Sequence, residues 1–173
     1  MRILTAGWYG VAAALCVSGS LALGAAPSPD QSFVKQAALD GMTEVEMANI
    51  ASEKSSSDEV KSFAARMLQD HSKADADLAA LAQSKSIKVP SKLDIKHKAM
   101  VDALKVRSGA SFDAVYAQHM AAAHAKAIAL FTKESQSPDA DMAAFARKTL
   151  PTLQEHKRLA DALDAKVSPK ATS

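Results

Sequence analysis

Apolar residues recur at helical spacing over four stretches of roughly 25 residues each, and this periodicity predicts an all-α fold. The four predicted helices cover residues 30–54, 56–84, 111–135 and 137–166. Aromatic residues make up only 5% of the chain, and much of its 48% apolar content is alanine, which favours closely packed helices over a sheet. We therefore expect a bundle of long helices.

Polar residues indicate where these helices begin. Asp30 is the expected N-cap of the first helix, and Ser56 with Glu59 has capping-box spacing at the start of the second. Ser137 is the expected cap of the last helix, because Pro138 suits the first helical position.

Two residues inside the predicted helices are poor helix formers. Gly41 costs about 1 kcal/mol relative to alanine, and we expect it to let a neighbouring helix approach closely. Pro151 removes a backbone donor and clashes with the carbonyl of Arg147, which predicts a bend around the core.

The connections between the helices predict two hairpins. Short turns join the first helix to the second and the third to the fourth, whereas residues 86–109 form a long connector with one short amphipathic stretch over 92–106. The two halves share a pattern: Phe63-Ala64-Ala65-Arg66 precedes Asp70-His71, and Phe145-Ala146-Arg147 precedes Glu155-His156. Two helical hairpins joined by a long crossover, here containing a short helix, form a ferritin-like four-helix bundle.

The N-terminal residues resemble a signal peptide. Arg2 is the only charged residue before the apolar run 11–23, and Ala22-Leu23-Gly24 places small residues at the positions that a signal peptidase reads. The run is shorter than the ~20 residues of a spanning helix, although an uncleaved anchor is the alternative. The expected organisation is a signal peptide (1–24), a linker (25–29), the bundle (30–166) and a disordered tail (167–173).

Composition excludes several classes of function. The net charge of +2 and the absence of a basic cluster argue against a nucleic-acid partner. The only cysteine, Cys16, lies in the predicted signal peptide, which excludes cysteine chemistry in the mature chain and permits a periplasmic or secreted location. The sequence contains no nucleophile elbow or phosphate loop, so it does not favour an enzyme, and an oxidase is the third alternative.

Histidines occupy unusual positions in the apolar stripes. His71, His119 and His156 lie near the stripe centres of three different helices, where imidazole nitrogens need partners. Glu44 and His124 lie at stripe edges. At a rise of ~1.5 Å per residue, Glu44, His71 and His124 lie ~17–22 Å along their helices from the hairpin turns. This depth places all three near mid-bundle. We expect those three to cluster, and His119 and His156 to pair or to join them.

Imidazoles and a carboxylate that converge in a bundle can bind Fe, Zn, Cu or Ni. Ferritin-like di-iron sites use Glu-x-x-His, but neither Asp70 nor Glu155 has a histidine three residues later, which argues against oxygen-activating di-iron chemistry. The alternative is that the core histidines only brace the bundle through hydrogen bonds. His97 lies in the lysine-rich connector and is expected to be solvated.

Several motifs together resemble those of a known family. They are Phe33-Val34-Lys35-Gln36-Ala37-Ala38, Gly41-Met42-Thr43-Glu44-Val45-Glu46, Phe63-Ala64-Ala65-Arg66-Met67 with Asp70-His71-Ser72-Lys73, Ser108-Gly109-Ala110-Ser111-Phe112-Asp113, Tyr116, His124, and Thr149-Leu150-Pro151-Thr152-Leu153 with Glu155-His156. The chain resembles an uncharacterised family of exported bacterial proteins, often labelled "predicted outer membrane protein". The resemblance implies a ferritin-like four-helix domain and no established activity.

Two functional hypotheses follow. The first is an exported bundle that binds or senses a metal ion in a stress-related role, with Glu44, His71, His119, His124 and His156 as candidate ligands. The second is a non-catalytic structural or interaction module of the cell envelope that binds an envelope protein. Both leave the oligomeric state open.

Overall fold

A computed structural model describes residues 27–168, which form five α-helices and no β-strand. The helices are α1 (Pro29–Lys54), α2 (Asp58–Ser84), α3 (Ile95–Lys105), α4 (Gly109–Glu134) and α5 (Ala140–Val167). The prediction of an all-α chain is confirmed, although α5 includes the first residue of the predicted tail. None of these five helices is long and apolar enough to cross a membrane. The predicted signal peptide lies outside the described residues.

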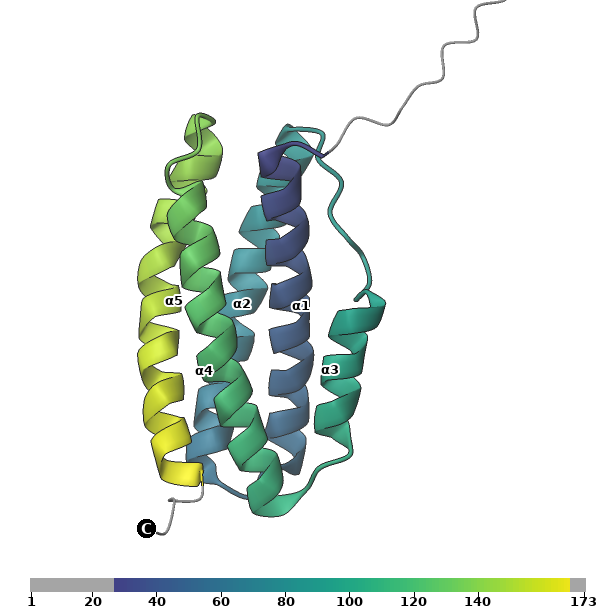
Figure 1. Cartoon of the computed structure of the whole chain (residues 1–173), viewed down its shortest axis with the longest axis vertical. Helices are drawn as coiled ribbons and strands as arrows, with labels where there is room; N and C mark the ends of the chain where they lie inside the picture. The colour runs from purple at the N-terminus through teal and green to yellow at the C-terminus, as the bar shows by residue number, and fades with distance from the viewer. Residues whose placement is uncertain (1–26, 169–173) are drawn as a thin grey trace, which may run out of the picture.

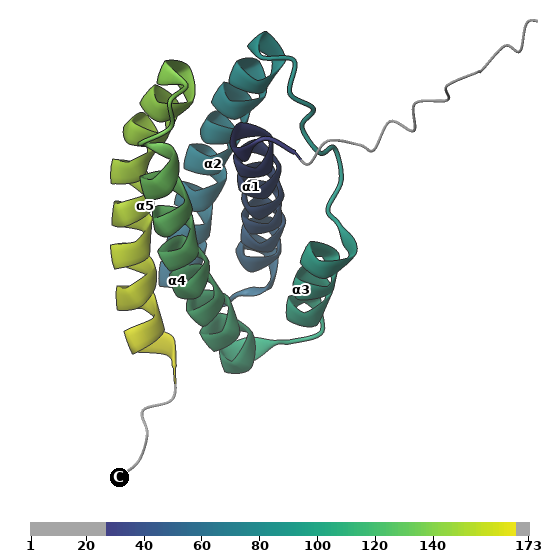
Figure 2. The same ribbon diagram turned by 45° about the horizontal axis from the view of Figure 1, so that its top comes forward.

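The four long helices form two antiparallel hairpins, α1–α2 and α4–α5, which pack side by side (Figure 1). Helix α1 contacts α4, and α2 contacts α5. From the upper end of α2 the chain descends along the outside of the bundle, passes through α3 and enters α4 at the lower end. Figure 2 shows α3 on the outside of the four long helices, beside α1 and the lower part of α4.

The first helix begins at Pro29, one residue earlier than predicted, and its cap is not Asp30. Ser28 is the N-cap of α1, and it exchanges hydrogen bonds with Gln31 in a capping box. Pro29 occupies the first helical position, where its missing N–H costs nothing. Asp30 therefore lies in the first turn, where its negative charge interacts favourably with the positive end of the helix dipole.

The starts of two other helices also differ from the prediction. Ser57, not Ser56, caps α2, because its hydroxyl is the one that accepts a hydrogen bond from the backbone N–H of Val60. Asp139, not Ser137, caps α5, and its carboxylate accepts from two backbone N–H groups. A carboxylate is a strong cap, and the cap of α5 lies two residues beyond the predicted Ser137.

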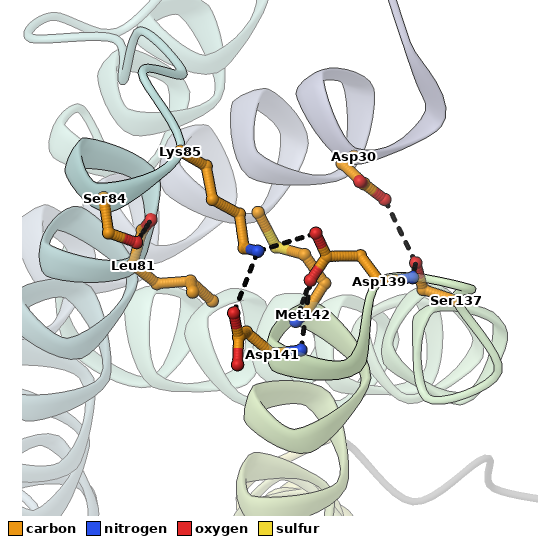
Figure 3. Close-up of polar contacts among 8 residues, drawn as sticks. All are labelled: Asp30, Leu81, Ser84, Lys85, Ser137, Asp139, Asp141 and Met142. Atoms are coloured by element: carbon orange, nitrogen blue, oxygen red, sulfur yellow. Dashed lines mark hydrogen bonds and ion pairs between the residues drawn. The ribbon is translucent and has the colours of Figure 1, made fainter.

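Polar contacts join the two hairpins at the upper end of the bundle (Figure 3). Lys85, which caps the end of α2, donates to Asp139 at 2.6 Å and to Asp141 at 3.1 Å at the start of α5. The hydroxyl of Ser137 donates to Asp30 of α1 at 3.2 Å. Exposed ion pairs contribute about 0–1 kcal/mol each, so these contacts align the hairpins rather than supply most of their stability.

The apolar interior is divided into two clusters. The lower cluster contains Met47, Ala48, Ala51, Val60, Phe63, Ala64, Met67, Val101, Leu104, Phe112, Tyr116, Ala117, Met120, Ala160 and Leu163. The upper cluster contains Phe33, Val34, Ala37, Ala38, Leu78, Ala82, Ala127, Phe131, Met142, Phe145, Ala146 and Leu153. A layer of polar residues lies between the two clusters.

The two poor helix formers lie within continuous helices. At Gly41 an added Cβ would lie 3.1 Å from Cγ of Asp75 on α2 and closer still to Oδ1, so the side chain of Asp75 fills the space that Gly41 leaves. Helix α5 runs through Pro151 without interruption. The bend expected at Pro151 stays a prediction.

The expectation that His97 is solvated is wrong. Its side chain is buried under α3, with the residue only 3% exposed. Nε2 lies 3.2 Å from Oδ1 of Asp40 on α1, and Nδ1 lies 2.7 Å from Oδ1 of Asp94, the N-cap of α3. At the other end of α3, Lys54 of α1 donates to the carbonyl of Arg107 at 2.9 Å. Polar contacts thus fasten both ends of α3 to α1.

Replacing His97 with alanine should release the first turn of α3 from α1. We expect the free energy of unfolding to fall by about 2 kcal/mol, because a buried ring and its contacts with two carboxylates are lost. Hydrogen exchange should accelerate in α3 and not in α2. The matched control is Ile95→Ala, whose side chain is 91% exposed on the same helix and should change little. Equal exchange in both variants would contradict this role of His97.

Candidate metal centre

Each long helix contributes one residue to the polar layer: Glu44 from α1, His71 from α2, His124 from α4 and His156 from α5. The exposed fractions of these residues are 3%, 7%, 0% and 1%, so the layer is almost inaccessible to solvent. Each residue lies on or beside the apolar stripe of its helix, which is why all four side chains point into the bundle. The hairpins align them at one level between the two clusters.

The three imidazoles form a nearly equilateral group. The ring centroids are 5.6 Å apart for His71 and His124, 5.4 Å for His71 and His156, and 5.3 Å for His124 and His156. Each ring offers one nitrogen that lies within 4.8 Å of the other two. Glu44 Oε2 lies 3.0 Å from His71 Nε2 and 3.8 Å from His124 Nε2. Three nitrogens and a carboxylate oxygen therefore converge from four helices.

Hydrogen bonds to the outer nitrogens set the tautomers of two rings. His124 Nδ1 lies 2.9 Å from the carbonyl oxygen of Met120, which can only accept, so Nδ1 carries the proton and Nε2 is bare. His156 Nε2 lies 2.8 Å from Oδ2 of Asp70, and donation to this carboxylate leaves Nδ1 bare. Histidines that bind metals are held in this way by an acceptor on the far side of the ring.

The inner nitrogens have no hydrogen-bond partner. Within residues 27–168, His71 Nε2, His124 Nε2 and His156 Nδ1 are all buried and without one, since the 3.0 Å contact of His71 with Glu44 lacks hydrogen-bond orientation. A buried polar atom without a partner costs about 1–3 kcal/mol, and native proteins contain few of them. Three such atoms facing one another indicate a position for a ligand.

Burial keeps the imidazoles neutral. It lowers the pKa of His71 to about 3, assisted by the neighbouring rings, and it lowers the pKa of His124 to about 4 against the opposing effect of the Met120 carbonyl. Burial also lowers the pKa of His156, although Asp70 opposes this. The pKa of Glu44 is raised well above its ordinary value by burial and then by nearby carboxylates. Neutral imidazole is the form that binds metals.

The structure brings together four of the five candidate ligands. Glu44, His71 and His124 cluster as expected from their depth, and His156 joins them. His119 does not join them: it is half-buried and lines a cavity of about 140 Å³ between α1, α3 and α4. Five residues separate His119 from His124, which turns their side chains roughly 140° apart around α4.

Sequence reasoning missed the role of Asp70. Asp70 directly precedes the inward-facing His71 on α2, and its carboxylate reaches His156 on the adjacent α5. Burial opposes its ionisation, but the hydrogen bond with His156 and the ion pair with Arg66 outweigh this and lower the pKa of Asp70. Glu155, in contrast, pairs with Arg158 away from the centre, as expected.

The depressed pKa of His124 predicts a pH-dependent stability. Between the ordinary pKa of 6.5 and about 4, the unfolded state binds a proton that folded His124 does not. In the presence of a chelator, the stability of the wild type relative to His124→Gln should therefore fall as the pH decreases from 6.5 to 4, by up to about 3 kcal/mol. Urea denaturation at several pH values measures this difference, and a constant difference would contradict it.

Comparisons with known proteins extend these observations. Residues 18–163 match the profile of a family described as "Domain of unknown function (DUF4142)", and no curated protein matches significantly. A DUF305 fragment from Deinococcus radiodurans has a TM-score of 0.72 at 15% identity, over 82% of this chain and 98% of that chain. A DUF305 protein from Streptomyces coelicolor, described as secreted, has a TM-score of 0.69 at 18% identity, over 86% of this chain and 99% of that chain. At these identities the likeness shows a shared fold.

Proposed function

The chain belongs to DUF4142, a family defined by a domain of unknown function, and we propose that it binds a transition-metal ion through His71, His124, His156 and Glu44. The observation that carries the proposal is the convergence of three buried imidazole nitrogens without a hydrogen-bond partner, one from each of three helices, beside a buried carboxylate. Bracing of the bundle would account for the outer hydrogen bonds of His124 and His156. It does not account for inner nitrogens that face one another without a partner.

The ligand set favours some metals over others. Neutral imidazoles suit Fe, Zn, Cu and Ni, whereas Mg²⁺ and Ca²⁺ prefer oxygen ligands. The three nitrogens now lie within 4.8 Å of one another, so metal–nitrogen bonds of about 2.0–2.1 Å would require them to move closer together. The positive ion would favour the ionised form of Glu44, so that binding releases a proton from this carboxyl.

The geometry favours binding or sensing over catalysis. Three histidines and one carboxylate complete a tetrahedral set, which is typical of closed sites, whereas catalytic sites retain an open position for water or substrate. The four ligands are also almost inaccessible. A stress-related role in metal binding or sensing fits a site of this kind.

We further propose that the protein is exported and ferritin-like. Two antiparallel hairpins joined by a long crossover support a ferritin-like arrangement. Support for export comes from the signal-peptide pattern of residues 1–24 and from the S. coelicolor protein of similar fold that is described as secreted.

The protein expressed without a polyhistidine tag should bind about one equivalent of Zn²⁺ or Co²⁺. The ion should stabilise the fold by about 2.7 kcal/mol at a free concentration one hundred times Kd, because it binds only the folded state. The double variant His71→Ala/His156→Ala should lose this binding and this shift in Tm. Isothermal titration and thermal denaturation measure the two effects.

The matched control is the double variant His97→Ala/His119→Ala, which removes two histidines outside the polar layer. It should retain one equivalent of metal even if its own stability is lower. Negligible metal binding by the wild type, or equal binding by the two double variants, would refute the proposed site.

Asp70→Asn should weaken metal binding without removing a ligand. The amide oxygen accepts a weaker hydrogen bond from His156 than the carboxylate does, so the ring is less firmly oriented and less basic. We expect a 10–100-fold rise in Kd. The control is Asp77→Asn on the same helix, whose carboxylate pairs with Lys73 and Lys148, and which should leave Kd unchanged.

A further inference from the structure

Asp75 is a carboxylate beside the polar layer to which the proposed site assigns no role. It lies one helical turn after His71 on α2, so both side chains are on the same face of that helix. Its carboxyl group rests against Gly41 of α1, where any other residue would place a Cβ in the way. In the described part of the chain Asp75 has neither a hydrogen-bond partner nor an ion pair, and burial raises its pKa to about 6.

A small cavity connects Asp75 with the candidate ligands. Its volume is about 40 Å³, and its lining includes Asp40, Gly41, Glu44, His71 and Asp75. This volume is enough for water molecules beside a small ion. Asp40 and Asp75 are only partly buried, whereas Glu44 and His71 are buried and His71 Nε2 has no hydrogen-bond partner. The lining therefore combines two partly buried carboxylates with two buried candidate ligands, and its remaining residues are mainly apolar.

A second cavity also reaches Glu44, from the side that α3 covers. Its lining includes Lys96 and Lys126, which would repel a metal cation. Among the described residues no lysine or arginine lines the cavity at Asp75. Residues of α3, which lies beside α1 (Figure 2), line the second cavity but not the cavity at Asp75. The charges of the two linings favour the α1–α2 side for a cation.

We propose that Asp75 forms an acidic portal between α1 and α2, through which a divalent cation reaches Glu44 and His71. Asp75 binds the ion transiently and passes it into the 40 Å³ cavity, and Gly41 provides the space for its carboxylate. This inference depends on the proposed metal centre. It adds a residue that controls the rate of uptake and is not a ligand of the bound ion.

Stopped-flow mixing with Co²⁺, whose absorption reports coordination, tests the portal. Asp75→Asn should slow association about tenfold, because a fixed carboxylate no longer attracts the cation. Dissociation from the centre should slow by a similar factor, since the same group assists exit, so Kd should change little. Asp77→Asn, two residues along the same helix and outside the cavity lining, should behave as the wild type.

Substitutions at Gly41 separate the charge of Asp75 from its packing. Gly41→Ala should displace the Asp75 carboxylate, lowering Tm and slowing uptake. The double variant Gly41→Ala/Asp75→Ala removes the overlap, so its Tm should recover relative to Gly41→Ala, while its uptake should remain slow. Recovery of both properties together would show that packing alone controls uptake and would overturn the portal.

Three further results would overturn the inference in distinguishable ways. Failure of the wild type to bind Co²⁺ would remove both the metal centre and the portal. Unchanged association in Asp75→Asn, with binding intact, would refute only the portal. Faster dissociation in Asp75→Asn with normal association would identify Asp75 as a ligand of the bound ion instead.

Discussion

The interior of this bundle depends on one layer of buried polar side chains in which three imidazole nitrogens lack a protein hydrogen-bond partner. Glu44, His71, His124 and His156 interrupt the apolar stripes of all four long helices at the same height. Each unsatisfied nitrogen costs about 1–3 kcal/mol, which is large against the 5–15 kcal/mol by which domains are normally stable. A bound cation would turn this layer from a cost into a cross-link between the helices.

The asymmetry of the crossover determines how the layer communicates with solvent. Helix α3 is fastened to α1 by His97 at one end and Lys54 at the other, and it covers one route toward Glu44. On the opposite side of α1 the absence of a side chain at Gly41 admits Asp75. Helix α1 is therefore covered by α3 on one side and contacted by the carboxylate of Asp75 on the other.

Much of the fold follows from periodicity, because an apolar stripe of roughly 25 residues has few alternatives to a packed helix. The exact helix starts do not, since Ser56, Ser57 and Asp58 are adjacent polar residues and only their hydrogen bonds identify the cap. The depth of a candidate ligand could be predicted by counting from the hairpin turns, and this located Glu44 and His71 near each other.

The angular position of a side chain was harder to predict than its depth. His119 and His124 are both near the apolar stripe of α4, and a single sequence does not show which of the two the neighbouring helices enclose. His97 was misjudged because its partner Asp40 is 57 residues away in the sequence. Asp70 was underestimated because its effect is exerted on His156 of another hairpin, through a contact that local pattern does not reveal.

The polar layer is shared equally between the hairpins, with two members from α1–α2 and two from α4–α5. Each hairpin alone therefore supplies only half of the four proposed ligands. Contacts within each hairpin are more extensive than those between them, so docking of the halves is the weaker step of assembly. An ion bound as proposed would therefore favour chains whose two hairpins have docked on each other.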